Sequence, residues 1–284
     1  MNNGTAFVTG AATGIGKALV EKLDREGWRC FAGYNRQPPD RLLKACGETT
    51  RAVHCNVADE ASVRAALSGI QDSLDGGALD LLVNNAATTG GAGGGVECVD
   101  IDRFKALFEV NFWGPLRIVQ GALPLLRRSE RARIINVGSA SRYLTIPLGC
   151  SYPVTKAALA KLTDALRVEM KPFGIEVTFL DPGGVKTPMM DITEEQKAEL
   201  WASFPDELLD SYQAHFKFPG DAIEATFPLW TAEEFADRMY REVVTDTRLK
   251  PSYLLGPGVW VLPLMQRTMP ESMLEKVFER MFRV

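Results

Sequence analysis

Residues 5–16 of the chain read TAFVTGAATGIG, and this stretch decides the fold. It begins with apolar and β-branched residues, as a buried strand requires. Gly10, Gly14 and Gly16 follow, and a helix-forming sequence comes next. Where a strand turns into a helix, residues without Cβ let a phosphate approach the backbone amides and the positive helix end. We therefore expect a phosphate-binding turn at residues 10–16.

The spacing of these glycines, G-x-x-x-G-x-G, separates the turn from two other phosphate loops. It differs from the common dinucleotide spacing G-x-G-x-x-G. It also differs from the P-loop, because Ala11 stands where that loop needs its first glycine, and Lys17 is followed by Ala18 rather than Ser or Thr. The alternative interpretation is a tight strand–helix turn without a ligand.

Short apolar runs and helix-period stretches continue to alternate along the chain. The strand-like runs are apolar throughout, which is typical of a sheet covered on both faces. This pattern predicts right-handed crossovers and an open, doubly wound parallel sheet of the α/β class. We expect strands at 5–9, 29–33, 51–54, 79–83, 133–137, 175–180 and 252–255, and helices at 15–26, 60–74, 101–126, 151–171, 231–244 and 271–281.

We expect one domain over residues 1–284, since the sequence shows no repeat and no linker. Residues 1–188 hold the regular alternation. Residues 189–230 carry large apolar groups with no clean period, so we expect an insertion there. A capping-box pattern at Thr231–Glu234 opens the last part, 231–284, in which a helix, a strand and a helix complete the domain.

Composition excludes several functional classes. A formal charge of −4, with 46% hydrophobic and 24% charged residues, predicts a globular protein without a nucleic-acid surface. Five cysteines without a C-x-x-C pair, and two histidines, predict neither a disulfide framework nor a metal site. Residues 1–4 do not resemble a signal peptide, and the apolar run 251–266 is interrupted by prolines and too short to span a membrane. We expect a cytoplasmic protein.

Three polar residues form a candidate site for proton transfer. Tyr152 and Lys156 stand at i and i+4, on one face of a predicted helix. Ser139 follows the strand expected at 133–137, at the sheet edge where such folds bind ligands. A free tyrosine has a pKa near ~10, and a neighbouring ammonium lowers it. Each residue alone fits a structural role, but together they predict a phenol that exchanges a proton with a substrate oxygen.

In these motifs the chain resembles the short-chain dehydrogenases/reductases, over residues 4 to about 190. The resemblance implies a Rossmann-type fold and an oxidoreductase that uses a nicotinamide cofactor. Besides the glycine turn, it rests on Asn84-Asn85-Ala86-Ala87, Asn111, Ser139, Tyr152-x-x-x-Lys156 and Pro182-Gly183-x-Val185-x-Thr187-Pro188.

The resemblance implies a catalytic tetrad. Tyr152 is its acid/base, and Ser139 orients and polarises the substrate oxygen. Lys156 lowers the pKa of Tyr152 and binds the nicotinamide ribose. Asn111 holds a water that links Lys156 to solvent.

The resemblance also implies the residues that bind the cofactor. Asn84 and Ala86 lie beside it, and Val185 and Thr187 contact its carboxamide and phosphates. The complete expected set is Gly10, Thr13, Gly14, Ile15, Gly16, Tyr34, Asn35, Arg36, Asn56, Val57, Asn84, Ala86, Tyr152, Lys156, Pro182, Gly183, Val185 and Thr187. No metal is expected.

Two residues depart from the family pattern. Ala87 stands where the family usually has glycine, which adds a methyl group to the cofactor wall. Asn56 replaces the usual aspartate at the adenine amine, but its side-chain oxygen still accepts a hydrogen bond. Neither residue belongs to the tetrad.

The end of the second strand selects between the two nicotinamide cofactors. Tyr34 occupies the slot of the aspartate that accepts from a ribose 2′-hydroxyl, and no acid follows until Asp40. Arg36 is placed to pair with a 2′-phosphate. Many NADP-binding relatives have a second basic residue where this chain has Thr13. We expect NADP(H), with NAD as the alternative.

The insertion at 189–230 lies where this family builds its substrate lid, and the resemblance implies a lipophilic ketone or secondary alcohol as the small-molecule substrate. A weaker resemblance, in residues 166–187 and 253–263, is to the retinol and hydroxysteroid dehydrogenases. It does not separate steroid, retinoid and acyl-ketone substrates. We expect the glycine-rich residues 90–95 near the pocket mouth, with a surface connector as the alternative. The family habit implies a homodimer or homotetramer.

The sequence leaves three other functions to compare with this one. A non-catalytic NADP(H)-binding regulatory protein of the same fold is expected to lose Tyr152 or Lys156, and both are present. A second alternative is a monotopic membrane enzyme that is anchored by residues 260–262 and the terminal helix. Packing of this helix against a second subunit explains its apolar residues equally well. A serine hydrolase is disfavoured, because the chain has no G-x-S-x-G motif.

Overall fold

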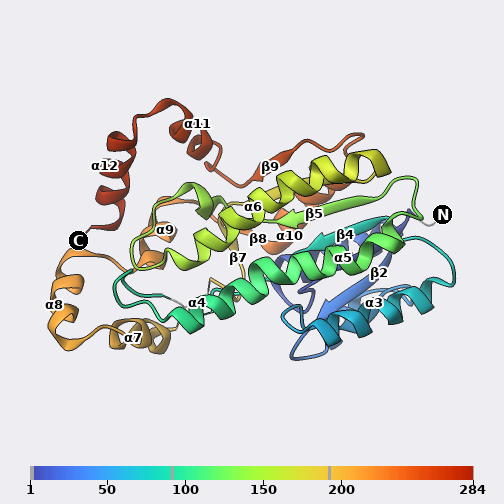
Figure 1. Cartoon of the computed structure of the whole chain (residues 1–284), viewed down its shortest axis with the longest axis horizontal. Helices are drawn as coiled ribbons and strands as arrows, with labels where there is room; N and C mark the ends of the chain where they lie inside the picture. The colour runs from blue at the N-terminus through green and yellow to red at the C-terminus, as the bar shows by residue number, and fades with distance from the viewer. Residues whose placement is uncertain (1–2, 91–92, 191–192, 284) are drawn as a thin grey trace.

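A seven-stranded parallel sheet lies at the centre of the structure, a computed structural model that describes residues 3–90, 93–190 and 193–283. The strand order is β3-β2-β1-β4-β5-β6-β9 (Figure 1). The strands are β1 Thr5–Val8, β2 Arg29–Tyr34, β3 Arg51–His54, β4 Leu81–Asn84, β5 Arg133–Val137, β6 Glu176–Pro182 and β9 Ser252–Leu255. The predicted doubly wound α/β sheet of Rossmann type is confirmed.

The order of the sheet reverses at β1, which pairs with β2 on one side and β4 on the other. Chains leaving neighbouring strands at such a reversal diverge to opposite faces, and a crevice opens at the carboxyl edge. The segments after β1 and β4 therefore border one crevice, and the segments after β5 and β6 extend the same edge.

Helices cover both faces of the sheet with separate apolar cores. On one face α1, α2 and α10 pack against the strands, and on the other face α3 and α5 do, together with the end of α6. These helices are α1 Gly14–Arg25, α2 Asp40–Ala45, α3 Glu60–Leu74, α5 Gly114–Leu126, α6 Ser151–Met170 and α10 Ala232–Met239. Covering both faces explains why the central strands are buried along most of their length and mostly apolar.

The prediction of one continuous helix over 101–126 is wrong at the centre of this range. The chain forms α4 Ile101–Phe108, a π-helical turn η1 Glu109–Trp113, and then α5. In the π turn the Gly114 N–H donates to the Glu109 carbonyl, five residues back rather than four. Such turns are frequent at functional sites, and this one carries Asn111.

Between β6 and α10 the chain forms three short helices and a two-stranded parallel pair. The helices are α7 Glu194–Ala202, α8 Asp206–His215 and α9 Pro219–Thr226, and the strands are β7 Val185–Lys186 and β8 Trp230–Thr231. These helices lie at the end of the molecule opposite the N-terminus (Figure 1). The predicted capping box is confirmed, since Thr231 and Glu234 bond each other's backbone at the start of α10. A second π turn, η4 Tyr240–Val244, continues α10.

The C-terminal part contains one helix that the sequence does not predict. The predicted terminal helix is α12 Glu271–Phe282, and it is preceded by α11 Val261–Thr268. Pro263 lies in the first turn of α11, where backbone N–H groups have no partner within the helix, so proline is tolerated there. None of the helices in the described part of the chain is long and apolar enough to cross a membrane.

Candidate active site

The residues after β5 and at the start of α6 meet at the carboxyl edge of the sheet. Ser139 follows β5 and caps the 3₁₀ turn η2 Ala140–Tyr143, where its Oγ accepts from the Ser141 N–H at 3.1 Å. Tyr152 lies in the first turn of α6 and is hydrogen-bonded to the Ser139 side chain. The Nζ of Lys156 is 5.7 Å from the centre of the Tyr152 ring. The structure thus brings these three predicted residues together.

Lys156 is a buried cation on the inner side of α6. It is 2% exposed, and its Nζ donates to the Val137 carbonyl at 2.9 Å. Burial lowers the pKa of Lys156 to about 8, while the Asp181 carboxylate acts in the opposite direction. The ammonium therefore carries its charge at neutral pH and loses it a little above.

The pKa of the Tyr152 phenol is higher than expected from the sequence. Burial raises the pKa of Tyr152 to about 12, and the hydrogen bond with Ser139 opposes this only in part. Burial disfavours the phenolate, the Asp181 carboxylate adds to the rise, and the expected lowering by Lys156 does not contribute. Tyr152 is therefore protonated at neutral pH, the state that donates a proton.

Asn111 ties the chain after β4 to α6. Its Oδ1 accepts from the Thr88 N–H at 2.9 Å, and its Nδ2 donates to the Thr88 carbonyl at 2.9 Å and to Thr155 Oγ1 at 3.1 Å. Thr155 in turn donates to the Tyr152 carbonyl at 2.8 Å. Both amide protons of Asn111 are thus engaged by protein groups, and the expected water at this residue stays a prediction.

The glycine turn packs directly on the chain that leaves β4. Gly10 has φ +65°, and a Cβ there would lie 2.7 Å from the Ala86 Cα. A Cβ on Gly16 would collide with the Gly10 carbonyl and lie 2.5 Å from the Asn85 Nδ2. A larger residue at either position would separate the turn from β4.

Thr9 and Asn85 hold this contact together. Thr9 Oγ1 accepts from the backbone N–H groups of Asn85 and Ala86, both at 3.0 Å. The Asn85 Nδ2 donates to the carbonyls of Thr9 and Gly10 at 2.9 and 3.1 Å. The sequence predicts no separate role for either residue; the only signal is a threonine before the first glycine and a second asparagine after β4.

The N-terminus of α1 is open to an anion. Its N-cap, Thr13, makes no side-chain capping bond, and the first turn holds no acid. The methyl group of Thr187 is next to Gly14, so the segment after β6 reaches this turn. The open amides and the glycine cradle fit a dinucleotide pyrophosphate.

The predicted residues on the β2 side of the crevice are more exposed. Asn35 and Arg36 are exposed, and Arg36 forms no ion pair with any described residue. Tyr34 packs edge-on against His54, with ring centroids 5.5 Å apart. Asn56 is engaged within its own loop, since its Oδ1 accepts from the Ala58 N–H at 3.2 Å.

The remaining expected residues are largely packed into the fold. The Asn84 Nδ2 donates to the Asn136 Oδ1 at 2.8 Å, and the Asn136 Nδ2 donates to Thr163 Oγ1 at 2.9 Å. This buried polar chain links β4, β5 and α6, so the cofactor contact of Asn84 stays a prediction. Further members of the set are partly or fully buried beside the crevice: Ile15, Val57, Ala86, Pro182, Gly183 and Val185.

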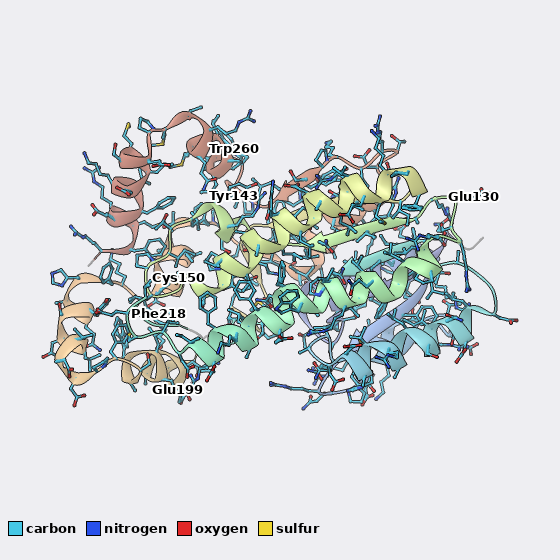
Figure 2. All side chains as sticks on the ribbon, viewed as in Figure 1. Glu130, Tyr143, Cys150, Glu199, Phe218 and Trp260 are labelled. Carbon is cyan, nitrogen blue, oxygen red and sulfur yellow. The ribbon has the colours of Figure 1, made fainter. Side chains whose placement is uncertain are left out.

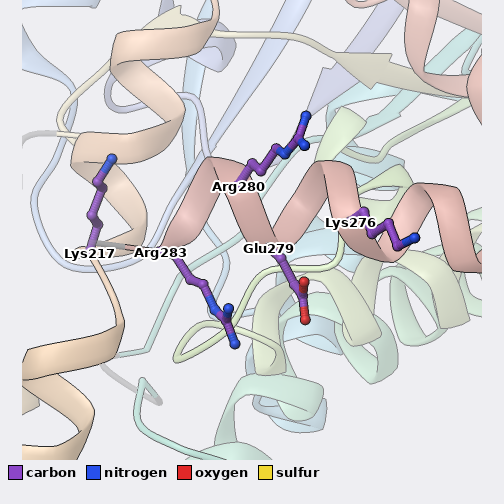
Figure 3. Close-up of a pocket in the computed structure, with 5 residues that line it drawn as sticks. All are labelled: Lys217, Lys276, Glu279, Arg280 and Arg283. Carbon is purple, nitrogen blue, oxygen red and sulfur yellow. The ribbon is translucent and has the colours of Figure 1, made fainter.

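A separate hollow of about 520 Å³ lies beside α12 (Figure 3). It is lined by Lys217, Lys276, Glu279, Arg280 and Arg283, all of them exposed. It shares no residue with the predicted site. The described residues contain no cluster of His, Cys, Asp or Glu that could hold a metal ion.

Comparison with known proteins identifies relatives over the whole chain. Residues 4–198 match the short chain dehydrogenase family. The uncharacterized oxidoreductase YusZ of Bacillus subtilis is 29% identical over 293 aligned positions, covering 99% of each chain. Estradiol 17-beta-dehydrogenase 2 of Mus musculus is 31% identical over 209 residues, 72% of this chain and 53% of that enzyme.

Solved structures share the fold. A short chain dehydrogenase from Burkholderia cenocepacia J2315, in complex with NADP, superposes with a TM-score of 0.73. It is 22% identical, and the match covers 97% of this chain and 98% of that one.

Replacing Gly16 by Ala tests the packing of the glycine turn on its own backbone and on the Asn85 side chain. The added methyl group collides with backbone, so we expect the free energy of unfolding to fall by about 1–3 kcal/mol, as for other overpacked sites. Gly69→Ala is the matched control, because Gly69 lies in α3 with nothing within 4 Å of its Cβ position. There we expect a gain of up to about 1 kcal/mol. Urea unfolding measures both, and equal effects would contradict the close contact.

Proposed function

Because the chain belongs to the short-chain dehydrogenase family, we propose that it transfers a hydride between NADP(H) and a lipophilic ketone or secondary alcohol, with Tyr152 as the acid/base. The observation that carries the proposal is the cluster of Tyr152, Ser139 and Lys156 on the same sheet edge as the glycine cradle. A proton donor, an oxygen-binding hydroxyl and a dinucleotide site are what carbonyl reduction needs.

In carbonyl reduction, a bound nicotinamide supplies the hydride, and side chains of this protein supply the proton. Ser139 donates a hydrogen bond to the substrate oxygen and places it beside Tyr152. The Tyr152 hydroxyl then gives its proton to that oxygen as negative charge develops there. The Lys156 ammonium stabilises the phenolate that Tyr152 becomes.

At neutral pH the charge states of the cofactor-free protein are the ones that carbonyl reduction uses. A base that removes a proton from an alcohol must first lose its own, and the raised pKa of Tyr152 opposes this. Near neutral pH the same raised pKa keeps the phenol ready to donate. Lys156 is still charged there, since its lowered pKa is about 8. We therefore propose the carbonyl as the substrate.

The preference for NADP(H) rests on the end of β2. Arg36 is exposed, free of ion pairs with described residues and followed by no acid before Asp40. An arginine in this place can bind a 2′-phosphate through charge-assisted hydrogen bonds. Neighbours of the same fold were solved with NADP and with NADH, so they support a nicotinamide cofactor and the preference rests on Arg36 alone.

The aromatic residues in and beside α7 and α8 are the reason for proposing a lipophilic substrate. Their aromatic rings form a continuous row, with centroids 4.7–5.8 Å apart, through Trp201, Phe204, Tyr212 and Phe216. The Tyr212 hydroxyl donates to Glu97 Oε1 at 2.5 Å, which fastens this region to the loop after β4. Of the loop expected near the pocket mouth, residues 91–92 lie outside the described residues. The relative from Mus musculus is named for estradiol, which is a lipophilic alcohol.

The alternative is a regulatory protein that binds NADP(H) without turnover. Tyr152, Ser139 and Lys156 retain mutual contacts that such a protein does not need. A panel of lipophilic ketones with NADPH and with NADH separates the two functions. Tight cofactor binding without oxidation of either cofactor would favour the regulatory protein.

Replacing Tyr152 by Phe removes the proposed proton donor and leaves the ring. We expect kcat to fall by roughly a hundredfold or more, the contribution of a positioned acid, with little change in the Kd for NADPH. Tyr253→Phe is the control, because Tyr253 lies in β9 and bonds Asp246. Initial rates and cofactor fluorescence give the two quantities. Near-normal turnover by the Tyr152 variant would remove the phenol from the mechanism.

The pH dependence of reduction should report Lys156. Below its pKa of about 8 the ammonium is charged and kcat/KM is level; above it the charge is lost and kcat/KM falls. The pKa of Tyr152, about 12, lies too high to cause this decline. In Lys156→Arg the side chain stays charged, so the remaining activity should not decline near 8. Lys161→Arg, on the exposed face of α6, should keep the wild-type profile.

Replacing Arg36 by Ala tests the cofactor preference. Loss of one charge-assisted hydrogen bond should raise the Kd for NADPH roughly tenfold and leave that for NADH almost unchanged. Arg64→Ala, an exposed position in α3, provides the control. Equal weakening of both cofactors would overturn the NADP(H) proposal.

A further inference from the structure

One buried carboxylate at this edge has no part in the mechanism above. Asp181 lies near the end of β6 and is 0% exposed. Burial raises the pKa of Asp181, and Arg142 acts against this rise. A buried carboxylate is costly to the fold unless it is paired and fully hydrogen-bonded. Its partners therefore indicate what it does.

Arg142 of η2 holds Asp181 with a two-pronged contact. Its Nε lies 3.0 Å from both carboxylate oxygens, and its Nη2 lies 2.8 Å from Oδ2. The guanidinium also contacts two rings, 4.2 Å from the centroid of Tyr143 and 5.2 Å from that of Phe179. The Tyr143 hydroxyl adds a longer bond to Oδ2, at 3.4 Å. These contacts hold the Arg142 guanidinium and the Asp181 carboxylate in one orientation.

The same carboxylate holds the backbone of Ser139. Asp181 Oδ1 accepts from the Ser139 N–H at 3.2 Å. It also packs closely on the preceding residue, since a Cβ on Gly138 would lie 2.8 Å from Oδ1. The Ser139 side chain is bonded to Tyr152, so a continuous path runs from Arg142 through Asp181 and Ser139 to the phenol.

We propose that Arg142 and Asp181 form a positioning pair that fixes the Ser139 backbone and thereby keeps the Ser139 hydroxyl beside Tyr152. This inference rests on the proposed function, in which Ser139 and Tyr152 act on the substrate oxygen. Neither member of the pair touches that oxygen. They act through Ser139.

The charge of Asp181 adds a second, measurable effect. The ionisable groups that face it are Arg142 and Tyr143 of η2 and Tyr152 and Lys156 of α6. The carboxylate raises the pKa of both Tyr152 and Lys156. It thus favours the protonated phenol and the charged ammonium, which are the states that reduction uses.

The C-terminal part of the chain supports the turn that carries the pair. Gln266 of α11 donates from Nε2 to the Tyr143 carbonyl at 3.1 Å. Leu262 of α11 packs in one apolar cluster with Ala140 and Tyr143. Figure 2 shows Tyr143 and Trp260, just before α11, on neighbouring segments. The Arg142 turn is therefore supported by both β6 and α11.

Asp181→Asn tests the proposal. The variant keeps the size of the side chain and an oxygen for the Ser139 N–H, but loses the charge and the fork to Arg142. Its control is Glu176→Gln, because Glu176 and Arg133 form an ion pair at 3.1 Å across the same strands, β6 and β5, at their opposite ends. Both variants are assayed for ketone reduction against pH and for NADPH affinity. The pKa of Lys156 is measured by NMR of isotope-labelled lysine, with Lys156→Arg for assignment.

In Asp181→Asn we expect kcat to fall by roughly tenfold to a hundredfold, the range that misplaced catalytic groups produce, with the Kd for NADPH unchanged. The pKa of Lys156 and the decline in kcat/KM should both move to lower pH, because a raising charge is lost. Glu176→Gln should match the wild type in all three measurements. A folded Asp181→Asn protein with wild-type kcat and pH profile would overturn the proposal.

Arg142→Lys separates positioning from charge and serves where Asp181→Asn does not fold. It keeps both charges but removes the fork, so we expect a lower kcat with an unchanged pKa of Lys156. Wild-type kcat in this variant would also overturn the proposal. If the wild-type protein reduces no ketone, the proposed function fails, and the NMR titration alone decides. A lower pKa of Lys156 in Asp181→Asn then supports the coupling, and an unchanged one refutes it.

Discussion

The approach of the glycine turn to the chain after β4 is the constraint on which the rest of the structure depends. Gly10 and Gly16 allow a backbone contact that no side chain permits, and Thr9 and Asn85 fasten it with hydrogen bonds. This contact fixes the distance between the glycine turn and the segment that follows β4. The same segment runs on to Thr88, which Asn111 binds to α6. The dinucleotide cradle and the proton donor are thus held by one continuous set of backbone contacts.

Burial governs the chemistry of this edge. Burial away from water favours the neutral form of both Tyr152 and Lys156. It therefore raises the pKa of the phenol and lowers the pKa of the amine. In the same low-dielectric surroundings an ion pair or hydrogen bond is stronger than in water. A single carboxylate, Asp181, can therefore influence two neighbours without touching a substrate. The same burial makes an unpartnered polar group costly, which accounts for the hydrogen bonds around Ser139 and Asn111. The buried Ser141 Oγ is an exception, with no partner among the described residues.

Sequence patterns predicted the elements that depend on local sequence. The strands at 51–54, 133–137 and 252–255 and the helix at 60–74 are found with the predicted bounds. The motifs also placed Ser139, Tyr152 and Lys156 together. The ion pair of Arg142 and Asp181 was not predicted, because it joins residues 39 positions apart. The raised pKa of Tyr152 was missed for a similar reason, since burial is a property of the folded molecule.

The π turn at Glu109–Trp113 amounts to one residue more than a regular helix would hold between α4 and α5. Each residue of an α-helix turns the chain by about 100°, so deleting one residue here would rotate α4 relative to α5 by roughly that angle. Asn111 would then lose its contacts with Thr88 and Thr155, although all other residues of α4, η1 and α5 were unchanged. The length of this segment is therefore as strict a requirement as its composition. Homologous chains with the same Asn111 contacts should tolerate substitutions in the turn far better than single-residue deletions.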